Sequence, residues 1–211
     1  MSKPVLVLGA GGHAKVLIDA LLQSGAVIAG ITDPAPASAG TNLLGVPVIG
    51  GDSVASDFPP SEILLVNGLG SVGLPLKRKD LFDRFREAGY SFATVIHPSA
   101  VIASDVVLGE GAQVMAGAVI QPGCHVGYNS IINTRASLDH DCFIGNDVHI
   151  APGVTLSGGV SVGACSHIGT GATLIQGIAI GNGCLVAAGA VVTKDIYDGA
   201  IVRGVPAREV Q

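Results

Sequence analysis

A repeat of six residues fills the second half of the chain and constrains its fold more than any other feature. From Ile96 to Val192, every sixth residue is Ile, Leu or Val. The repeat runs through Ile96, Ile102, Leu108, Val114, Ile120, Val126, Ile132, Leu138, Ile144, Ile150, Leu156, Val162, Ile168, Leu174, Ile180, Val186 and Val192. No insertion interrupts it, so we expect no large loop to leave this region.

The period itself selects the kind of structure. A helix repeats about every 3.6 residues and a strand every two, whereas six residues suit a short strand followed by a tight turn. We therefore expect a parallel β-helix whose large aliphatic side chains fill the interior. The residue four places after each aliphatic is small or β-branched, as at Cys124 and Cys142, and suits a cramped turn. The residue directly after the aliphatic is often glycine, as at Gly109 and Gly145, and such a glycine is expected to supply a positive φ.

Charged residues are scarce in the repeat region, where Arg135 is the only basic residue. Flat faces of this composition would expose much neutral and apolar surface to water, so we expect them to be buried between subunits. The segment 152–193 has no charged residue at all. Gly, Ser, Thr and Asn break it throughout, however, and this is not the continuous apolar run of a membrane-spanning helix.

The hexads resemble those of the hexapeptide-repeat acyltransferases. That resemblance implies a left-handed β-helix with three hexads in each turn, hence about five coils between Ile96 and Val192. It also implies a homotrimer with active sites between subunits. The segment Gly204-Val205-Pro206-Ala207-Arg208 is similar to the closing segment of many of these enzymes.

The first ninety-five residues have the pattern of a nucleotide-binding α/β unit. A strand over Val5–Leu8 leads into Gly9-Ala10-Gly11-Gly12-His13-Ala14 and then a helix. Glycines at such a junction let backbone N–H groups approach a phosphate at the helix N-terminus. A second strand is predicted over 27–31 and a third over 62–66, followed by a helix over 76–88. Asp33 ends the second strand, where an acid commonly holds a ribose hydroxyl or a base edge.

This unit is about half the size of a full dinucleotide fold, so it suits one nucleoside diphosphate better than NAD. Joined to the hexads, it makes the whole chain resemble the nucleotide-sugar acetyltransferases of the PglD and NeuD type. The expected fold is an α/β half-Rossmann domain over 1–95 and a left-handed β-helix over 96–211. The expected substrate-binding residues are Gly11, Gly12, His13, Asp33, Asn67, Gly68 and Asn133.

His140 is the candidate general base, since acetyl transfer to an amine needs a group that takes the amine proton. It lies two residues after a core Leu, so its side chain should point outward, and Asp139 and Asp141 flank it. The run from Asp139 to Ile150 resembles the catalytic segment of the family. That resemblance makes His140 the base and Asp141 the acid that orients it, with Asp139 a weaker alternative, and it places Asn133 in the site.

Coenzyme A is the implied acyl donor, with acetyl-CoA as co-substrate and no metal. Gly158 lies eighteen residues after His140, one coil further on, and its backbone N–H could hold the thioester carbonyl. On the family pattern His149 lies near the site. Lys194, Arg203 and Arg208 could meet the coenzyme phosphates, or be ordinary surface charges. His149 and His167 are also eighteen apart, and a column of neutral histidines is favoured over a metal site.

Composition excludes several partners. A net charge of −5 and a pI near 5.6 argue against nucleic acid or an anionic membrane as the main partner. The four cysteines form no C-x-x-C pair and are expected to be small buried thiols. Met1-Ser2-Lys3-Pro4 leads directly into the first strand, so we expect no secretory signal and a cytoplasmic protein.

The favoured function is an acetyl-CoA-dependent N-acetyltransferase acting on a nucleotide-linked 4-amino-4,6-dideoxy sugar, such as GDP-perosamine or its UDP or dTDP counterparts. The alternative is an O-acetyltransferase acting on a sialic-acid hydroxyl, as in NeuD-like relatives. A zinc lyase of the γ-carbonic-anhydrase type would use the same hexads but lacks a clear third ligand here. A non-catalytic β-helix would be favoured by regular threonine ladders, and none is evident. The nucleotide base, the sugar stereochemistry, the acyl length and the pathway stay open.

Overall fold

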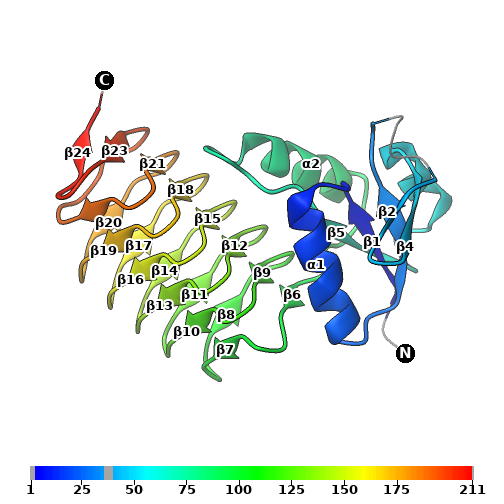
Figure 1. Ribbon diagram of the computed structural model, residues 1–211, viewed down its shortest axis with the longest axis horizontal. Coiled ribbons are helices and arrows are strands. Elements are labelled where there is room, and N and C mark those ends of the chain that lie inside the picture. The colour runs from blue at the N-terminus through cyan, green and yellow to red at the C-terminus, as the bar shows by residue number, and fades with distance from the viewer. Residues whose placement is uncertain (1–2, 36–39, 211) are drawn as a thin grey trace.

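An α/β domain comes first along the chain and a three-sided prism of short strands comes second (Figure 1). The structure is a computed structural model and describes residues 3–35 and 40–210. The prism is a left-handed parallel β-helix, and the α/β domain is Rossmann-like. None of the described helices is both long enough and apolar enough to span a membrane.

The α/β domain is built around the central strand β1 (Val5–Leu8), which is buried along its whole length. Its sheet contains β3 (Asn42–Leu43), β4 (Val46–Gly50), β2 (Ile28–Thr32), β1 and β5 (Leu64–Asn67), in that spatial order. The helices are α1 (Gly12–Gln23), α2 (Leu76–Glu87) and the short 3-10 helix η2 (Asp52–Asp57). Alternate residues of β1 serve two cores, because Val5 and Val7 pack with α1 whereas Leu6 and Leu8 pack with α2.

The predicted strands and helices of this domain are present, with ends shifted by one or two residues. The hairpin of β3 and β4 was not predicted. Leu44 and Gly45 join its strands, and both have positive φ, 52° and 84°, as in a two-residue hairpin turn. A leucine in the left-handed region is uncommon, so Leu44 was not a recognisable signal for this turn.

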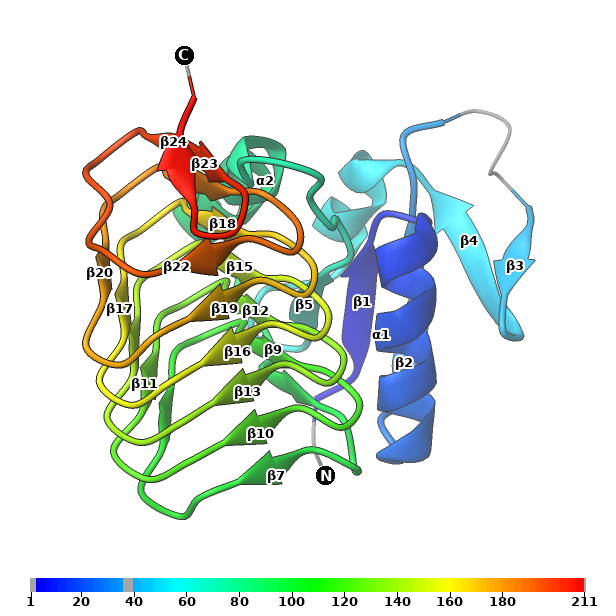
Figure 2. The same ribbon diagram turned by 60° about the vertical axis from the view of Figure 1, so that its left-hand side comes forward.

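The prism has three flat faces, each a sheet of parallel strands in which neighbours are eighteen residues apart, for example His149 beside His167 (Figure 2). The C-terminal end of the first face departs from this pattern, because Ile201 pairs with Leu185, sixteen residues before it, and the last strand is antiparallel. The first face contains β6 (Val95–Ile96), β9 (Gln113–Val114), β12 (Ile131–Ile132), β15 (His149–Ile150), β18 (His167–Ile168), β21 (Leu185–Val186), β23 (Ile201–Arg203) and β24 (Arg208–Glu209). The second contains β7 (Val101–Ile102), β10 (Val119–Ile120), β13 (Ser137–Leu138), β16 (Thr155–Leu156), β19 (Thr173–Leu174) and β22 (Val191–Val192). The third contains β8 (Val107–Leu108), β11 (His125–Val126), β14 (Phe143–Ile144), β17 (Ser161–Val162) and β20 (Ala179–Ile180).

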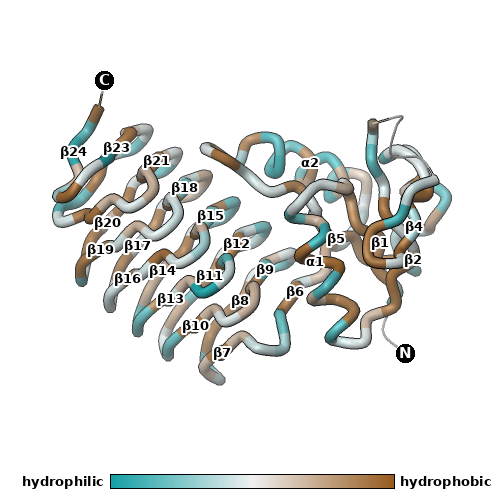
Figure 3. The backbone as a smooth tube through the Cα atoms, in the orientation of Figure 1, coloured by the Kyte–Doolittle hydropathy of each residue, from teal (hydrophilic) through white to brown (hydrophobic). Residues whose placement is uncertain are grey.

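The aliphatic column fills the prism interior as predicted, except at its start. From Val114 to Val192 its members are buried, and the apolar segments recur from coil to coil in Figure 3. Ile96 is 43% exposed, and Ile102 and Leu108 are only half-buried. The expectation was wrong there because no coil lies beneath the first one to cover these side chains.

Positive φ occurs three residues after each core aliphatic, not directly after it. It recurs every six residues from Gly111 to Gly189, and Asp141 (φ 59°) is one of the few non-glycine members. Gly109 and Gly145 are not in the left-handed region, so the expectation for them was wrong. They are needed for close approach: a Cβ on Gly109 would lie 2.5 Å from the backbone nitrogen of Tyr128 in the next coil.

The small residues of the turns join one coil to the next. The thiols of Cys124 and Cys142 donate to the carbonyls of Asp139 and Ser157, each fifteen residues on. Three of the four cysteines are buried, as expected, but Cys165 is half-buried and occupies a positive-φ position, φ 59°.

The α/β domain packs on the first face of the prism, where α1 contacts β6. Met115 joins the apolar core of the α1 side and Tyr128 packs against that of the α2 side, where its ring stacks on Phe82 at 5.5 Å. The two parts thus share a packed boundary, and the candidate site lies beside it.

Candidate active site

A cavity of about 650 Å³ lies between the α/β domain and the prism. Its walls come from the N-terminus of α1, the loop after β5, and the first face of the prism with its adjoining corner. The lining residues are Gly11, Gly12, His13, Val16, Gly68, Leu69, Gly70, Ser71, Val72, Asn133, Thr134, His149, Ala151, Pro152, His167 and Thr170. We call this cavity the cleft.

The N-terminus of α1 forms one wall of the cleft. No side chain caps the helix at Gly11, and a Cβ on Gly11 or Gly12 would meet nothing within 4 Å. The first N–H groups of a helix have no partner within it, and they carry partial positive charge. This wall is therefore suited to an anionic oxygen.

His13 closes the inner side of that wall. Its Nε2 lies 2.7 Å from Oε1 of Gln113, whose own Nε2 donates to the carbonyl of Asn67 at 2.8 Å. This second bond fixes the Gln113 amide, so Oε1 accepts and the Nε2 of His13 carries the proton. Burial, and then the nearby Arg78 charge, lower the pKa of His13 to about 4, although the bond to Gln113 opposes the shift. His13 is neutral at physiological pH.

His149 occupies the opposite wall, on β15 of the prism. Its Nδ1 lies 2.7 Å from Oγ of Ser71, and its Nε2 lies 3.0 Å from Nδ2 of Asn133. His149 is 5% exposed, and its ring packs edge-on against His167, with ring centroids 4.8 Å apart. Burial lowers the pKa of His149 to about 3, and the charges that His167, His13 and Arg78 carry when protonated add to this shift. Both ring nitrogens are engaged with Ser71 and Asn133, which favours the neutral histidine column over a metal site.

Arg78 on α2 shapes the loop that overhangs the cleft. Its guanidinium is buried and donates to three carbonyls: Asn129 at 3.0 Å, Asn67 at 2.9 Å and Leu69 at 2.8 Å. Burial lowers the pKa of Arg78 to about 9, while the charge of Asp147 opposes the shift. The loop that presents Ser71 is thus held by a charged group inside the domain boundary.

His140 lies at another corner of the prism, in the turn that joins β13 to β14. Its Nδ1 lies 2.8 Å from Oδ2 of Asp141, and its backbone N–H donates to Asp139 at 2.8 Å. The side chain is 54% exposed. The bond to Asp141, before the charge of Asp139, raises the pKa of His140 above its usual value.

Gly158 lies against the imidazole of His140 from the next coil. A Cβ on Gly158 would collide with Nε2 of His140, and the backbone N–H of Gly159 donates to the His140 carbonyl at 2.8 Å. Asp141 keeps a carboxylate at a positive-φ position where most equivalent residues are glycine. Nε2 of His140 is therefore directed outward, beside a glycine backbone.

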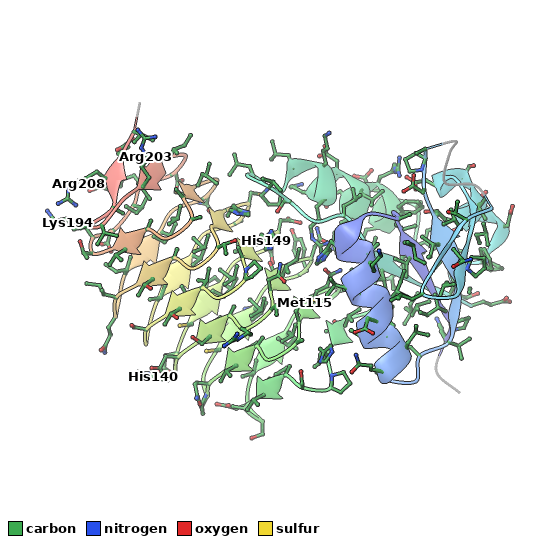
Figure 4. The ribbon with its side chains drawn as sticks, in the orientation of Figure 1. Met115, His140, His149, Lys194, Arg203 and Arg208 are labelled. Atoms are coloured by element: carbon green, nitrogen blue, oxygen red, sulfur yellow. The ribbon has the colours of Figure 1, made fainter. Side chains whose placement is uncertain are left out.

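The cleft and His140 are separate within one chain, as Figure 4 shows for His149 and His140. Asn133 lies at the corner between the first and second faces, which we call the cleft corner. His140 lies at the corner between the second and third faces, which we call the base corner. A whole face of the prism separates the two.

The other predicted residues fall into four groups. Gly11, Gly12, His13, Gly68, Asn133 and His149 line the cleft. Asn67 is buried behind it, and its Nδ2 donates to Arg78 and Asn129. Asp33 accepts the backbone N–H groups of Ala10 and Ala35, at 2.9 and 2.8 Å, and does not line the cleft. Lys194, Arg203 and Arg208 gather at the C-terminal end of the prism (Figure 4).

Sequence reasoning missed Ser71, Arg78 and Gln113. Ser71 follows the run Asn67-Gly68-Leu69-Gly70, and this second glycine-rich loop after a strand was its only signal. Gln113 could have been noticed as an amide among the mostly apolar outward residues of the first face. Arg78 had no signal, because a basic residue on an amphipathic helix normally faces water.

Comparisons with known proteins extend over the whole chain. The PglD N-terminal domain family matches residues 4–85, and the bacterial transferase hexapeptide family (six repeats) matches residues 141–176. No curated protein sequence matches the chain.

Three solved structures have the same fold along their full length. The acetyltransferase domain of PglB from Neisseria gonorrhoeae, solved in complex with acetyl coenzyme A, is 34% identical, with a TM-score of 0.91 and 100% of both chains covered. PerB from Caulobacter crescentus, in complex with CoA and GDP-perosamine, is 40% identical, with a TM-score of 0.91 and 100% and 99% coverage. WeeI from Acinetobacter baumannii is 26% identical, with a TM-score of 0.88 and 99% and 100% coverage. The chain therefore belongs to the hexapeptide-repeat acetyltransferases that carry a PglD N-terminal domain.

Proposed function

We propose that the chain transfers the acetyl group of acetyl-CoA to the amine of a nucleotide-linked 4-amino-4,6-dideoxy sugar. The observation that carries the proposal is the His140–Asp141 pair, whose outward Nε2 lies against Gly158. PerB, bound to CoA and GDP-perosamine, supports this class of substrate. The PglB domain bound to acetyl coenzyme A supports the donor.

His140 acts as general base in this proposal. The amine nitrogen attacks the thioester carbonyl carbon, the C–N bond forms, and the C–S bond then breaks. Nε2 of His140 takes the proton lost by the amine and returns it to the coenzyme thiolate. Asp141, bonded to Nδ1, holds the ring in the tautomer with a bare Nε2 and stabilises the imidazolium that forms.

The backbone of Gly158 is proposed to hold the oxyanion of the tetrahedral intermediate. The N–H of Gly159 is already donated to His140, which leaves the Gly158 N–H as the nearest candidate. Only glycine fits at 158, because a side chain there would displace the imidazole. An oxyanion donor of this kind contributes about 10²-fold or more to a rate.

The cleft is proposed to bind the nucleotide sugar, and residues 1–95 to form the nucleotide-binding domain. Gly11, Gly12 and His13 would meet the diphosphate, and Gly68 and Asn133 would approach the sugar. Asp33 and Asn67 would not contact the substrate directly but would position the loops to which they are hydrogen-bonded. The open helix N-terminus in the cleft wall supports this assignment.

A homotrimer with shared active sites is also proposed. The second face separates the cleft corner from the base corner, and its outward residues are uncharged: Val101, Val119, Ser137, Thr155, Thr173 and Val191. Packing of three such faces around an axis would place the His140 of one subunit beside the cleft of the next. One chain alone would contain both the cleft and His140, but too far apart to act on the same substrate.

Coenzyme A would lie in the groove between neighbouring prisms, with its thioester between His140 and Gly158. Its phosphates would meet Lys194 and Arg208 at the C-terminal end, with His149 near the acceptor side. Because the donor is made in the cytoplasm, we propose that the enzyme acts there.

Thiol release from acetyl-CoA tests the proposal. The assay compares GDP-, UDP- and dTDP-linked 4-amino-4,6-dideoxy sugars with free sialic acids. We expect turnover with one nucleotide amino sugar and none with sialic acid. Turnover with sialic acid alone would make the enzyme an O-acetyltransferase and refute the proposal.

A further inference from the structure

The hydroxyl of Ser71 has a hydrogen-bonding role that its neighbours dictate. Ser71 lies in the loop after β5, lines the cleft and is half-buried. Among the described residues, the one hydrogen-bond partner of its hydroxyl is Nδ1 of His149, at 2.7 Å. The direction of this bond follows from the partners of His149.

Asn133 determines which nitrogen of His149 is bare. Its Oδ1 accepts the backbone N–H of Thr134 at 2.7 Å, so the amide orientation is fixed and Nδ2 is the group that faces His149. An amide nitrogen can only donate. The Nε2 of His149, 3.0 Å away, is therefore the acceptor and carries no proton.

His149 must then carry its single proton on Nδ1. The ring is neutral, because burial lowers its pKa to about 3. With Nε2 bare, the Nδ1–H group donates to Oγ of Ser71.

The Ser71 hydroxyl is left with a hydrogen to donate. Its oxygen receives a bond from His149, and no described residue accepts its own O–H. We infer that Ser71 is a substrate-binding residue whose hydroxyl donates to an acceptor oxygen of the nucleotide sugar in the cleft, and that Asn133 and His149 fix it in this role. The inference rests on the proposed function for the identity of the ligand.

The other groups of the cleft favour the same kind of ligand atom. The α1 wall presents N–H groups at Gly12, and the pKa of His13, about 4, leaves that ring uncharged. The cleft thus offers donors without a full charge, and these can bind a phosphate oxygen or a sugar hydroxyl. Both are oxygen acceptors within one substrate, and the experiment separates them.

Calorimetric titration tests the inference without an acyl donor. The ligands are GDP, UDP and dTDP, and their 4-amino-4,6-dideoxy sugars. Ser71→Ala should raise the dissociation constant about tenfold, the loss expected for one hydrogen bond to a charged or polar oxygen. Ser71→Thr should keep the affinity within about twofold, because it keeps the hydroxyl. Ser56→Ala is the matched control, since that hydroxyl donates to Ser53 on η2, away from the cleft, and its loss should change nothing.

The two sources of the acceptor give different patterns. A phosphate acceptor predicts that Ser71→Ala weakens the binding of the nucleoside diphosphates as well as the sugars. A sugar acceptor predicts a loss with the nucleotide sugars alone. Unchanged affinity for every ligand in Ser71→Ala would overturn the inference.

The tautomer can be measured with no ligand at all. In protein labelled with ¹⁵N-histidine, His149 should show a protonated Nδ1 and a bare Nε2 from pH 5.5 to 8.5, and His149→Gln identifies the signal. A proton on Nε2 would overturn the inference even if the nucleotides bind. Failure of the wild-type protein to bind any nucleotide would instead refute the proposed function, while this spectrum would still report on Ser71.

Discussion

The pKa values of the cleft histidines and of the histidine at the base corner are shifted in opposite directions. His149 and His13 are enclosed between the two domains, and their pKa values fall to about 3 and 4. His140 lies in solvent beside two carboxylates, and its pKa rises. Burial disfavours the protonated form of the two cleft histidines, and a carboxylate partner stabilises the protonated form of His140.

This difference separates binding from proton transfer. A neutral, buried histidine holds its neighbours in one hydrogen-bonding pattern and does not change charge near neutral pH. An exposed histidine with a raised pKa can take a proton and release it. In the proposed function the cleft therefore serves recognition, and the base corner serves the chemistry.

Removal of the base should give the largest effect. His140→Ala should lower kcat about 10³-fold and leave the affinity for the nucleotide sugar unchanged, because the diphosphate is proposed to bind at the α1 wall of the cleft and not at His140. Steady-state rates and calorimetry measure the two quantities. His125→Gln on the third face, a histidine outside the site, should keep near-normal turnover. If His140→Ala kept full activity, the base corner would have no catalytic role.

Arg78→Met should destabilise the loop that overhangs the cleft. It leaves the carbonyls of Asn67, Leu69 and Asn129 without their donor, at about 1 kcal/mol each, or about 3 kcal/mol in all. The melting temperature should fall by about 10 °C. Arg84→Met on the same helix loses an exposed ion pair with Asp52 and a cation–π contact with Phe85, and it should change the melting temperature much less. Equal melting temperatures for the two variants would mean that the buried network does not stabilise the boundary.

Asp141→Asn should act on the base corner alone. The raised pKa of His140 means that activity falls as the pH drops through that pKa, because the imidazolium cannot accept a proton. Without the carboxylate the pKa falls towards the usual 6.5, so the acidic limb of the kcat profile should move to lower pH. Plateau activity should drop about tenfold. A limb at an unchanged pH would show that Asp141 does not set the basicity of His140.

The smallest effect is expected when the pH is changed and the affinity of the cleft for a nucleotide sugar is measured. A nucleoside diphosphate hexose without an amine keeps a constant charge between pH 5.5 and 8.5. Because His13 and His149 stay neutral over this range, its dissociation constant should vary less than about twofold. A steep change in affinity near pH 6.5 would show that a cleft histidine titrates there.

The sequence predicted the prism better than the cleft, for a physical reason. Each coil repeats the environment of the last, so the spacing of Leu138 and Ile144 is enough to place His140 outward and Gly158 beside it. Errors arose where the repeat ends, as at Ile96, which has no coil beneath it. The position of positive φ was also misassigned, because close approach and backbone conformation both favour glycine.

The cleft depends on contacts between distant segments. Ser71 meets His149, and Arg78 meets Asn129, and no local pattern links either pair. The glycine loop at Gly11 and Gly12 was visible because one segment supplies both the turn and the helix N-terminus. The sequence did not show whether His13 faces solvent or the cleft, since this depends on Gln113, one hundred residues away.

Subunit complementation tests most directly whether the cleft of one chain works with the base of another. His140→Ala and Gly12→Trp, which fills the cleft, should each be inactive alone. Co-expressed in equal amounts, they should recover about a quarter of wild-type turnover, because in random trimers a quarter of the sites pair an intact base with an intact cleft. Mixed trimers without activity would show that each site is made by a single chain.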